Sequence, residues 1–297
     1  MVKPFSEAVQ GASFAIAAEL TLRRDSTADD VRRQADELGR LVDGIQVTDN
    51  PYGWVQMSAL SASAILVDHG FDPVPVLTCR DRNRMALESD LLGLQALGVS
   101  SLMLMRGHRV PKKHVMPAAS VFDLTGRELI ALAAALDGGF FIGTGARVFR
   151  PGPRWQADSL TLRSAAGAGF VQTQLCFNMD ILRRYMARFV EAESTRDFPV
   201  MVSLSPLPSA TTALWVKKNM SDSRIPDALI KRLEDASDPE QEGIAICAEL
   251  MQEISGIPGV SGVNLMTTGD PKALPATIRA AGLRVENPRI IDQRFPK

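Results

Sequence analysis

Short apolar runs alternate with longer amphipathic runs along almost the whole of the 297-residue chain. Eight of the short runs have the length of a strand and are nearly continuously apolar. A pattern of this kind is typical of strands in a parallel sheet that is covered on both faces. The predicted strands are Phe14–Leu20, Gly44–Thr48, Val74–Thr78, Ser101–Met105, Phe140–Thr144, Phe170–Gln174, Val200–Leu204 and Gly262–Met266.

The longer runs between these strands carry apolar residues at helical spacing. Thr27–Val42 opens with a threonine and early aspartates, which is a helix N-cap signal. Arg84–Leu97 is followed by Gly98, a residue type that commonly ends a helix. The other predicted helices are Leu124–Leu136, Asn178–Ala192, Ala210–Asn219, Glu242–Ile254 and Pro271–Ala281.

Eight strands that alternate with helices predict a (β/α)8 TIM barrel of the α/β class, as a single domain over residues 1–297. The competing architecture is an open, doubly wound sheet that binds a dinucleotide. Such a sheet needs a glycine-rich turn after an early strand. The first turn here, residues 20–24, reads LTLRR and has no glycine, so the pattern favours the closed barrel.

Composition narrows the class of protein further. Apolar residues make up 45% of the chain and charged residues 23%, which is typical of a globular protein. A net charge of −1 gives no electrostatic reason to expect nucleic acid or an anionic membrane as partner. No window approaches the roughly 18 apolar residues of a membrane span.

The cysteines Cys79, Cys176 and Cys247 are odd in number, far apart and without a CxxC pair. They therefore predict neither a disulfide framework nor a metal site. We expect a cytoplasmic protein without a metal, and the sequence leaves self-association to a homo-oligomer open.

In barrels of this class the active site is built at the C-terminal ends of the strands. Glu19 stands at the end of the first predicted strand, after mainly small or apolar residues. Burial there would raise the pKa of its carboxyl group into the range that suits a general acid. The alternative is a solvated glutamate paired with Arg23 or Arg24.

Two further strand ends carry candidate ligand groups. The segment LTCRDRNR, residues 77–84, places three arginines before a helix, which suits phosphate groups. A surface turn stabilised by ion pairs is the alternative for this segment. In Arg106-Gly107-His108, the glycine would let a ligand approach the backbone and the histidine can titrate near neutrality. A lone histidine is, however, more often structural than catalytic.

Several segments, in this order, resemble the methylenetetrahydrofolate reductase family. The first strand ending in Glu19 is similar to the family's opening strand, whose glutamate is the catalytic acid. The resemblance runs from about Ser13 to Leu283. The segment that begins with LTCRDRNR is similar to a subgroup of the family that is found beside corrinoid-dependent methyl transfer. The other similar segments are GIQVTDN, LTCRDRNRMALESDLLGLQALGVSSLMLMRGH with ASVFDLTGRELI, GAGFVQTQLCFN and SLSPLPSATTALWVKKNMSDSRIPDALIKRL.

This resemblance implies the interconversion of 5,10-methylenetetrahydrofolate and 5-methyltetrahydrofolate, with NAD(P)H as electron donor and FAD as carrier. It implies that Glu19 protonates N10 of the folate, and that His108 stands beside the reacting centre. The implied cofactor-binding residues are Thr48, Thr78, Arg80, Arg82, Asn83, Arg106, Gly107 and His108, and the implied substrate-binding residues are Asp49, Gln174 and Leu207.

The chain departs from the family pattern at three places. His108 stands where most members have an aspartate, and Val76 where many have a histidine. The basic cluster that holds flavin phosphate before the sixth strand is reduced to Arg163 within residues 162–165. These departures leave two alternatives: a flavin-independent reductase that takes hydride directly from NADH, and a non-catalytic folate-binding partner of a corrinoid methyltransferase. The reaction could also run in the oxidative direction, in a demethylation pathway.

Overall fold

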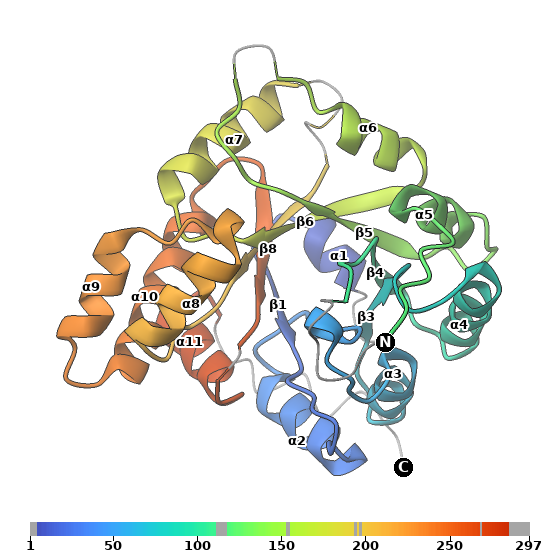
Figure 1. Cartoon of the computed structure of the whole chain (residues 1–297), viewed down its shortest axis with the longest axis horizontal. Coiled ribbons are helices and arrows are strands. Elements are labelled where there is room, and N and C mark those ends of the chain that lie inside the picture. The colour runs from blue at the N-terminus through green and yellow to red at the C-terminus, as the bar shows by residue number, and fades with distance from the viewer. Residues whose placement is uncertain are drawn as a thin grey trace.

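The computed structural model describes residues 5–110, 118–152, 155–192, 195, 198–267 and 269–284. Its strands are all parallel and close into a barrel in chain order, with the helices around the outside (Figure 1). This confirms the predicted (β/α)8 barrel. The strands are β1 (Ala15–Glu19), β2 (Gly44–Val47), β3 (Pro73–Thr78), β4 (Ser101–Met105), β5 (Phe141–Ala146), β6 (Ala168–Leu175), β7 (Val200–Leu204) and β8 (Val260–Leu265).

The barrel closes where β8 pairs with β1, and this seam needs a residue without a side chain. Gly262 of β8 lies in register with Ala15 of β1. A Cβ atom added to Gly262 would lie 2.1 Å from the carbonyl oxygen of Ala15, far inside van der Waals contact. Glycine is therefore the residue that permits the two strands to approach at the seam.

The seven predicted helices are all present, and their end signals act as expected. Thr27 and Asp30 form a reciprocal capping box at the start of the helix Ala28–Leu38. Gly98, which follows the helix Arg84–Ala96, has a φ of +77°. The helices are α1 (Phe5–Gln10), α2 (Ala28–Leu38), α3 (Ala59–Asp68), α4 (Arg84–Ala96), α5 (Gly126–Ala134), α6 (Asp158–Ala165), α7 (Met179–Glu191), α8 (Ala210–Asn219), α9 (Asp227–Asp235), α10 (Pro239–Ser255) and α11 (Ala273–Ala281).

Four of these helices, α1, α3, α6 and α9, were not predicted. The α3 sequence ALSASAILVD is made largely of small residues, so its polar and apolar faces differ little. The α6 and α9 helices begin without a side-chain cap, and α1 has only six residues. Each therefore lacks a start signal or a clear period, and packing against the barrel supplies the stability instead.

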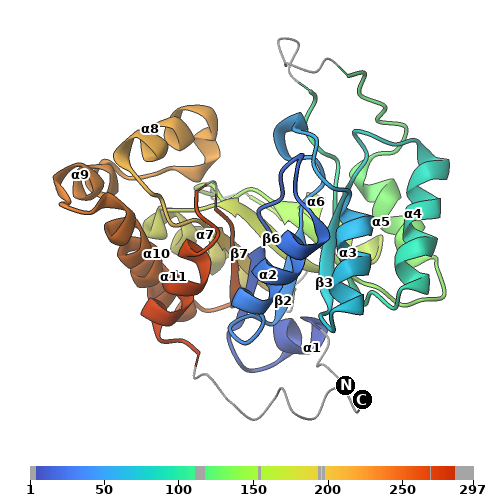
Figure 2. The same ribbon diagram turned by 90° about the horizontal axis from the view of Figure 1, so that it is seen from below.

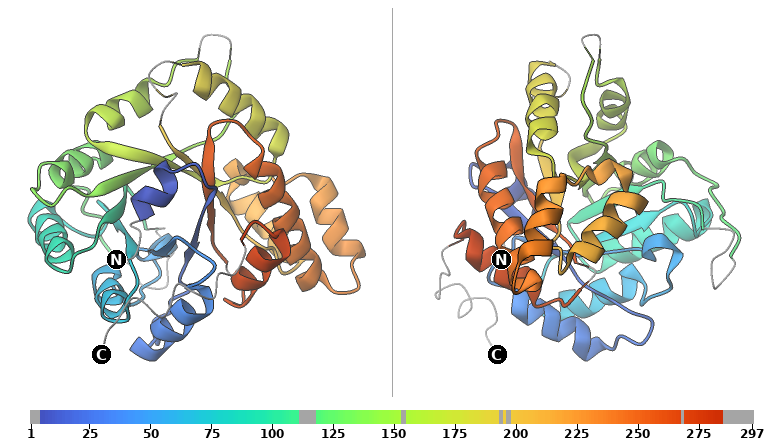
Figure 3. Two further views of the ribbon diagram at one scale, coloured as in Figure 1. Left: turned by 180° about the vertical axis from the view of Figure 1, so that it is seen from behind. Right: turned by 60° about the vertical axis from the view of Figure 1, so that its left-hand side comes forward.

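Helix α1 closes the N-terminal end of the barrel, as seen from below in Figure 2 and from behind in the left view of Figure 3. Its Phe5 and Val9 pack inside the barrel in a cluster that includes Val74, Phe170 and Met201. Phe5 meets Phe170 edge to face, with ring centroids 5.6 Å apart. This end of the barrel interior is filled with apolar side chains, so the open space inside the barrel lies at the opposite end.

No helix in the described part of the chain is both long enough and apolar enough to pass through a membrane.

Candidate active site

A cavity of about 650 Å³ lies at the C-terminal ends of the strands. Its walls include Glu19 of β1, Thr78 of β3, Gln172 of β6 and Ser203 of β7. Cavities of roughly 300–1,000 Å³ are the size that holds small ligands and cofactors. Its position is the one at which enzymes with this fold place their chemistry.

Glu19, the last residue of β1, places its carboxyl group in this cavity at the end of the barrel interior. Successive residues of a strand point to opposite faces, so Glu19 faces inward as Ala17 does. Its Oε1 accepts a hydrogen bond of 3.0 Å from Nδ2 of Asn264 on β8. Burial raises the pKa of Glu19 from 4.5 to about 7, and the Asn264 hydrogen bond lowers it in part. A carboxyl group of this pKa can exchange a proton at neutral pH, as a general acid or base requires.

Two glutamines form the floor of the cavity. Gln46 Nε2 donates to Gln172 Oε1 at 2.7 Å, and Gln172 Nε2 donates to Gln46 Oε1 at 3.1 Å. Both residues are buried. A carboxamide has two N–H donors and two acceptor lone pairs, so each glutamine keeps one N–H and one lone pair beyond this pair.

Two other polar atoms near the floor are buried and have no hydrogen-bond partner among the described residues. They are Oδ1 of Asn264 and Oγ of Ser203, from neighbouring positions on β8 and β7. Buried polar atoms are nearly always paired, with protein, water or ligand. The interior below Glu19 is therefore polar but uncharged, and it is able to bind a polar ligand.

Sequence reasoning missed Gln46, Gln172 and Asn264 because it considered only the residues at the ends of strands. A usable signal was present, since each is a polar residue inside an apolar strand. Gln46 and Gln172 also share the inward face with the strand-end residues Thr48 and Gln174, two positions further along.

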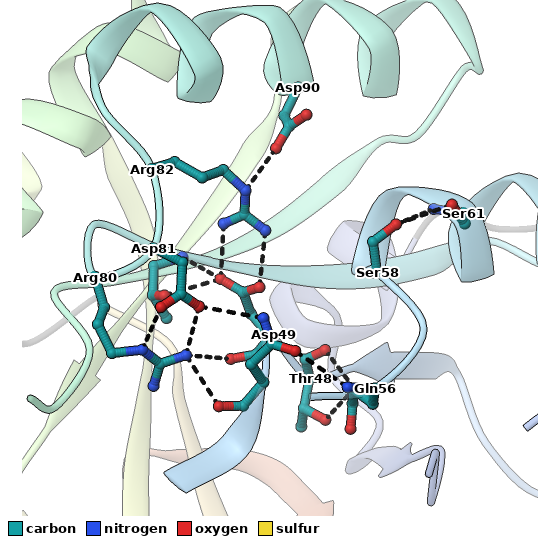
Figure 4. Close-up of polar contacts among 11 residues, drawn as sticks. Thr48, Asp49, Gln56, Ser58, Ser61, Arg80, Asp81, Arg82 and Asp90 are labelled. Atoms are coloured by element: carbon teal, nitrogen blue, oxygen red, sulfur yellow. Dashed lines mark hydrogen bonds and ion pairs between the residues drawn. The ribbon is translucent and has the colours of Figure 1, made fainter. Parts of the chain in front are cut away.

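Asp49 and Arg82, which were predicted to bind substrate and cofactor, bind each other (Figure 4). The two amino groups of Arg82 donate to the two oxygens of Asp49 at 2.8 and 2.9 Å. Asp49 also accepts from the backbone and hydroxyl of Thr78, at 2.9 and 2.8 Å, and Arg82 reaches Asp90 at 2.9 Å. These contacts tie β2 and β3 to α4, and they neutralise the charge of Arg82.

The other predicted cofactor ligands of this region are also engaged within the protein. Arg80 lines the cavity but donates to both oxygens of Asp81 at 2.6 Å. Asn83 caps α4 through the backbone N–H of Ala86, and Arg106 stacks on the ring of Phe122 at 4.3 Å. Arg82, Asn83 and Arg106 lie outside the lining of the cavity.

Thr48, Gly107 and His108 do lie in the cavity wall. Thr48 Oγ1 accepts from Gln56 Nε2 at 3.1 Å. Gly107 has a φ of +79°, and a Cβ atom there would lie 3.0 Å from Cβ of Thr78. The glycine therefore allows a tight turn directly at the wall, and His108 is exposed beside it.

The two remaining predicted substrate residues differ in their positions. Gln174 lines the cavity, but its amide bonds both the N–H and the carbonyl of Val148 and the carbonyl of Asp222. Both of its N–H groups are therefore used to hold the cavity wall. Leu207 is buried in the hydrophobic core and is not part of the lining.

Arg163 is a half-buried cation in the cavity wall. It donates to the carbonyl of Gly145 and, at 3.1 Å, to Oγ of Ser159. Among the described residues it has no carboxylate partner, and burial lowers the pKa of its guanidinium group. A partly buried positive charge that lacks a carboxylate among the described residues is suited to an anionic ligand such as a phosphate group.

Together, fold and site define a (β/α)8-barrel protein whose ligand-sized cavity is built around one carboxyl group of raised pKa. The family model of methylenetetrahydrofolate reductase matches residues 6–282, and the chain belongs to this family. The match confirms the resemblance found in the sequence. No curated protein matches the chain.

Solved structures show the same fold at low sequence identity. A protein from Clostridium thermocellum that binds two copies of 5-methyl-5,6,7,8-tetrahydrofolic acid is 13% identical, with a TM-score of 0.61 over 93% of this chain and 96% of that one. Dihydropteroate synthase from Stenotrophomonas maltophilia is also 13% identical, with a TM-score of 0.51 over 92% of both chains. Tryptophan synthase from M. tuberculosis is 15% identical, with a TM-score of 0.53 over 95% of this chain and 100% of that one.

Proposed function

We propose that the protein interconverts 5,10-methylenetetrahydrofolate and 5-methyltetrahydrofolate, with NAD(P)H as the electron donor and Glu19 as the catalytic acid. The observation that carries the proposal is the carboxyl group of Glu19, which lies in the cavity with a pKa of about 7. Membership of the methylenetetrahydrofolate reductase family supports the choice of reaction. The 5-methyltetrahydrofolate bound by the Clostridium thermocellum protein supports a reduced folate as ligand.

In the reductive direction, Glu19 transfers its proton to N10 of the folate, and the five-membered ring opens to an iminium ion. Protonated Glu19 is well populated at neutral pH because of its raised pKa. After the transfer, the carboxylate keeps the hydrogen bond from Asn264 Nδ2, which favours the charged form. In the oxidative direction the same carboxylate takes the proton back, which suits a pathway that starts from methylated folate.

The family implies FAD, and part of the site fits this cofactor. Arg163, which has no carboxylate partner in the described part of the chain, offers a positive charge for a phosphate group, and Gly107 allows a ring system to approach the backbone closely. Arg80 and Arg82 fit less well, since internal carboxylates already neutralise them. Bound FAD would supply a hydride carrier between nicotinamide and folate, with Thr48 and His108 at its ring.

The test is the substitution Glu19→Gln, which keeps the size of the side chain but replaces the carboxyl group with an amide that cannot transfer a proton to the folate. We expect the rate of methylenetetrahydrofolate reduction to fall by at least about 100-fold, the usual contribution of a general acid. Binding of 5-methyltetrahydrofolate should persist. Glu234→Gln, on the exposed surface of α9, is the matched control and should leave the rate unchanged.

Both rates are followed under anaerobic conditions with NADH, together with the visible absorbance of the purified protein. Reduction that survives in Glu19→Gln would contradict the proposed acid. A colourless protein of full activity would contradict FAD and favour direct hydride transfer from the nicotinamide. A wild-type protein that binds folate without reducing it would contradict the enzymatic function and favour a binding role.

A further inference from the structure

The turn that follows β2 has a backbone conformation that few side-chain-bearing residues adopt. Asn50 has φ and ψ of 44° and 63°, and Tyr52 has 56° and 15°. Asparagine tolerates the left-handed region, whereas a bulky aromatic residue there is strained. Strain of this kind persists where the surroundings enforce it, and it concentrates at ligand sites.

Arg80 and Asp81 of the LTCRDRNR segment hold this turn in place (Figure 4). Arg80 Nη2 donates to the carbonyls of Asn50 and Asp49, at 2.9 and 3.3 Å. Asp81 Oδ2 accepts from Nδ2 of Asn50 at 3.2 Å. Because Arg80 is buried and bonded to Asp81, this ion pair holds both the backbone and the side chain of Asn50.

The turn places the ring of Tyr52 at the mouth of the cavity that contains Glu19. Tyr52 lines this cavity, yet 51% of its surface is exposed. Its hydroxyl group donates to Sδ of Met220 at 3.5 Å, on the segment after α8. Desolvation, together with the negative charge of Glu19, raises the pKa of Tyr52 above its ordinary value of 10.0, so the hydroxyl remains protonated well into the alkaline range. The ring is therefore held from two sides and still has surface free to cover a ligand.

We propose that Tyr52 contributes to ligand binding by packing its ring on the planar pyrimidine half of the pterin of a reduced folate beside Glu19, and that Arg80 and Asp81 position it. Aromatic rings prefer to stack, offset, on other planar rings, and the contact removes apolar surface from water. This role rests on the proposed function, because it names the ring that Tyr52 would cover. It explains why a strained tyrosine stands where glycine would be relaxed.

The experiment measures binding of 5-methyltetrahydrofolate to the full chain by titration calorimetry. Tyr52→Gly relieves the left-handed strain, so this variant should be at least as stable as the wild type while its affinity falls about tenfold. Tyr52→Phe keeps the ring and should bind within about twofold of the wild type. Trp54→Leu changes an exposed aromatic residue of the same turn that is not in the lining, and it should bind normally.

The outcomes separate the two proposals. No binding by the wild type contradicts the proposed function, whereas wild-type binding that Tyr52→Gly leaves unchanged contradicts the role of Tyr52. The positioning role is tested by Asp81→Asn alone and combined with Tyr52→Gly. If Asp81 acts through Tyr52, its effect on affinity disappears in the Tyr52→Gly background. Additive effects of the two substitutions would overturn the positioning role.

Discussion

Two opposing interactions set the chemistry of Glu19. Burial at the barrel mouth disfavours its carboxylate, while the hydrogen bond from Asn264 favours it. The first effect is the larger, so the pKa rises to about 7 and not further. Without the hydrogen bond from Asn264 the pKa would be higher still, so this bond keeps a larger share of Glu19 ionised at neutral pH.

The raised pKa has a consequence for stability. Glu19 ionises at about 4.5 in the unfolded chain and at about 7 in the folded one. Between these values the unfolded state loses its proton first, so the free energy of unfolding falls as the pH rises from 4.5 to 7 and then levels off. Glu19→Gln lacks this loss and should gain up to about 3 kcal/mol over the wild type between pH 4 and pH 8, at about 1.4 kcal/mol per pH unit.

Urea unfolding of both proteins across this pH range checks the prediction. A difference between them that does not change with pH would show that Glu19 ionises normally in the folded protein. Glu234→Gln, at an exposed position, serves again as control and should show no gain.

Some residues of the site could be predicted from the sequence and others could not. Glu19 was found because a carboxylate at the end of an apolar strand is a local pattern, and the family resemblance then implied its catalytic role. The reciprocal pair of Gln46 and Gln172 joins β2 to β6 across the barrel, and nothing local to either residue indicates the other. Arg163 was seen only as the remnant of a basic cluster, since its burial depends on how α6 packs.

At the level of elements, the segment after β3 is an ion-paired connection. The sequence left open whether LTCRDRNR bound phosphate or formed internal ion pairs, and the structure has Arg80 and Arg82 in internal pairs. The partners of Arg82 could not be assigned in advance, because Asp49 follows β2 and Asp90 belongs to α4. Only the folded barrel brings these separate elements together.

Loss of Arg82 should leave the buried carboxylate of Asp49 without its counter-charge. The side chain of Asp49 is 1% exposed, so Arg82→Met should lower the free energy of unfolding by about 3 to 5 kcal/mol. Arg183→Met removes an ion pair with Glu253 on the surface and should cost less than about 1 kcal/mol. Denaturant titration at neutral pH compares the two, and equal losses would contradict the structural role of Arg82.

At the level of the whole molecule, the barrel is closed at both its seam and its base. The number and order of the strands followed from the apolar pattern. Their register did not, because a register depends on contacts between strands that are distant in sequence. The seam of β1 and β8 joins the two ends of the barrel, and α1 fills the base with Phe5 and Val9.

The seam makes a prediction for the whole fold. Gly262→Ala places a methyl group against the backbone of Ala15, so β1 and β8 have to separate. We expect a loss of several degrees in the melting temperature, as overpacking typically costs about 1 to 3 kcal/mol. Gly256→Ala, an exposed position after α10 with ordinary contact distances, should melt close to the wild type. Equal melting temperatures for both variants would show that the seam tolerates a side chain.

The two amides on the cavity floor, Gln46 and Gln172, depend on each other for their hydrogen bonds. Each amide completes the other, so a change at Gln46 or Gln172 alone leaves a buried polar group unpaired. Replacing both glutamines with apolar residues of similar size would make the floor of the cavity apolar, with little change in the free energy of unfolding. A polar ligand is thus what gives the two amides a use, and without it these residues, 126 positions apart in the chain, could be replaced at little cost only together.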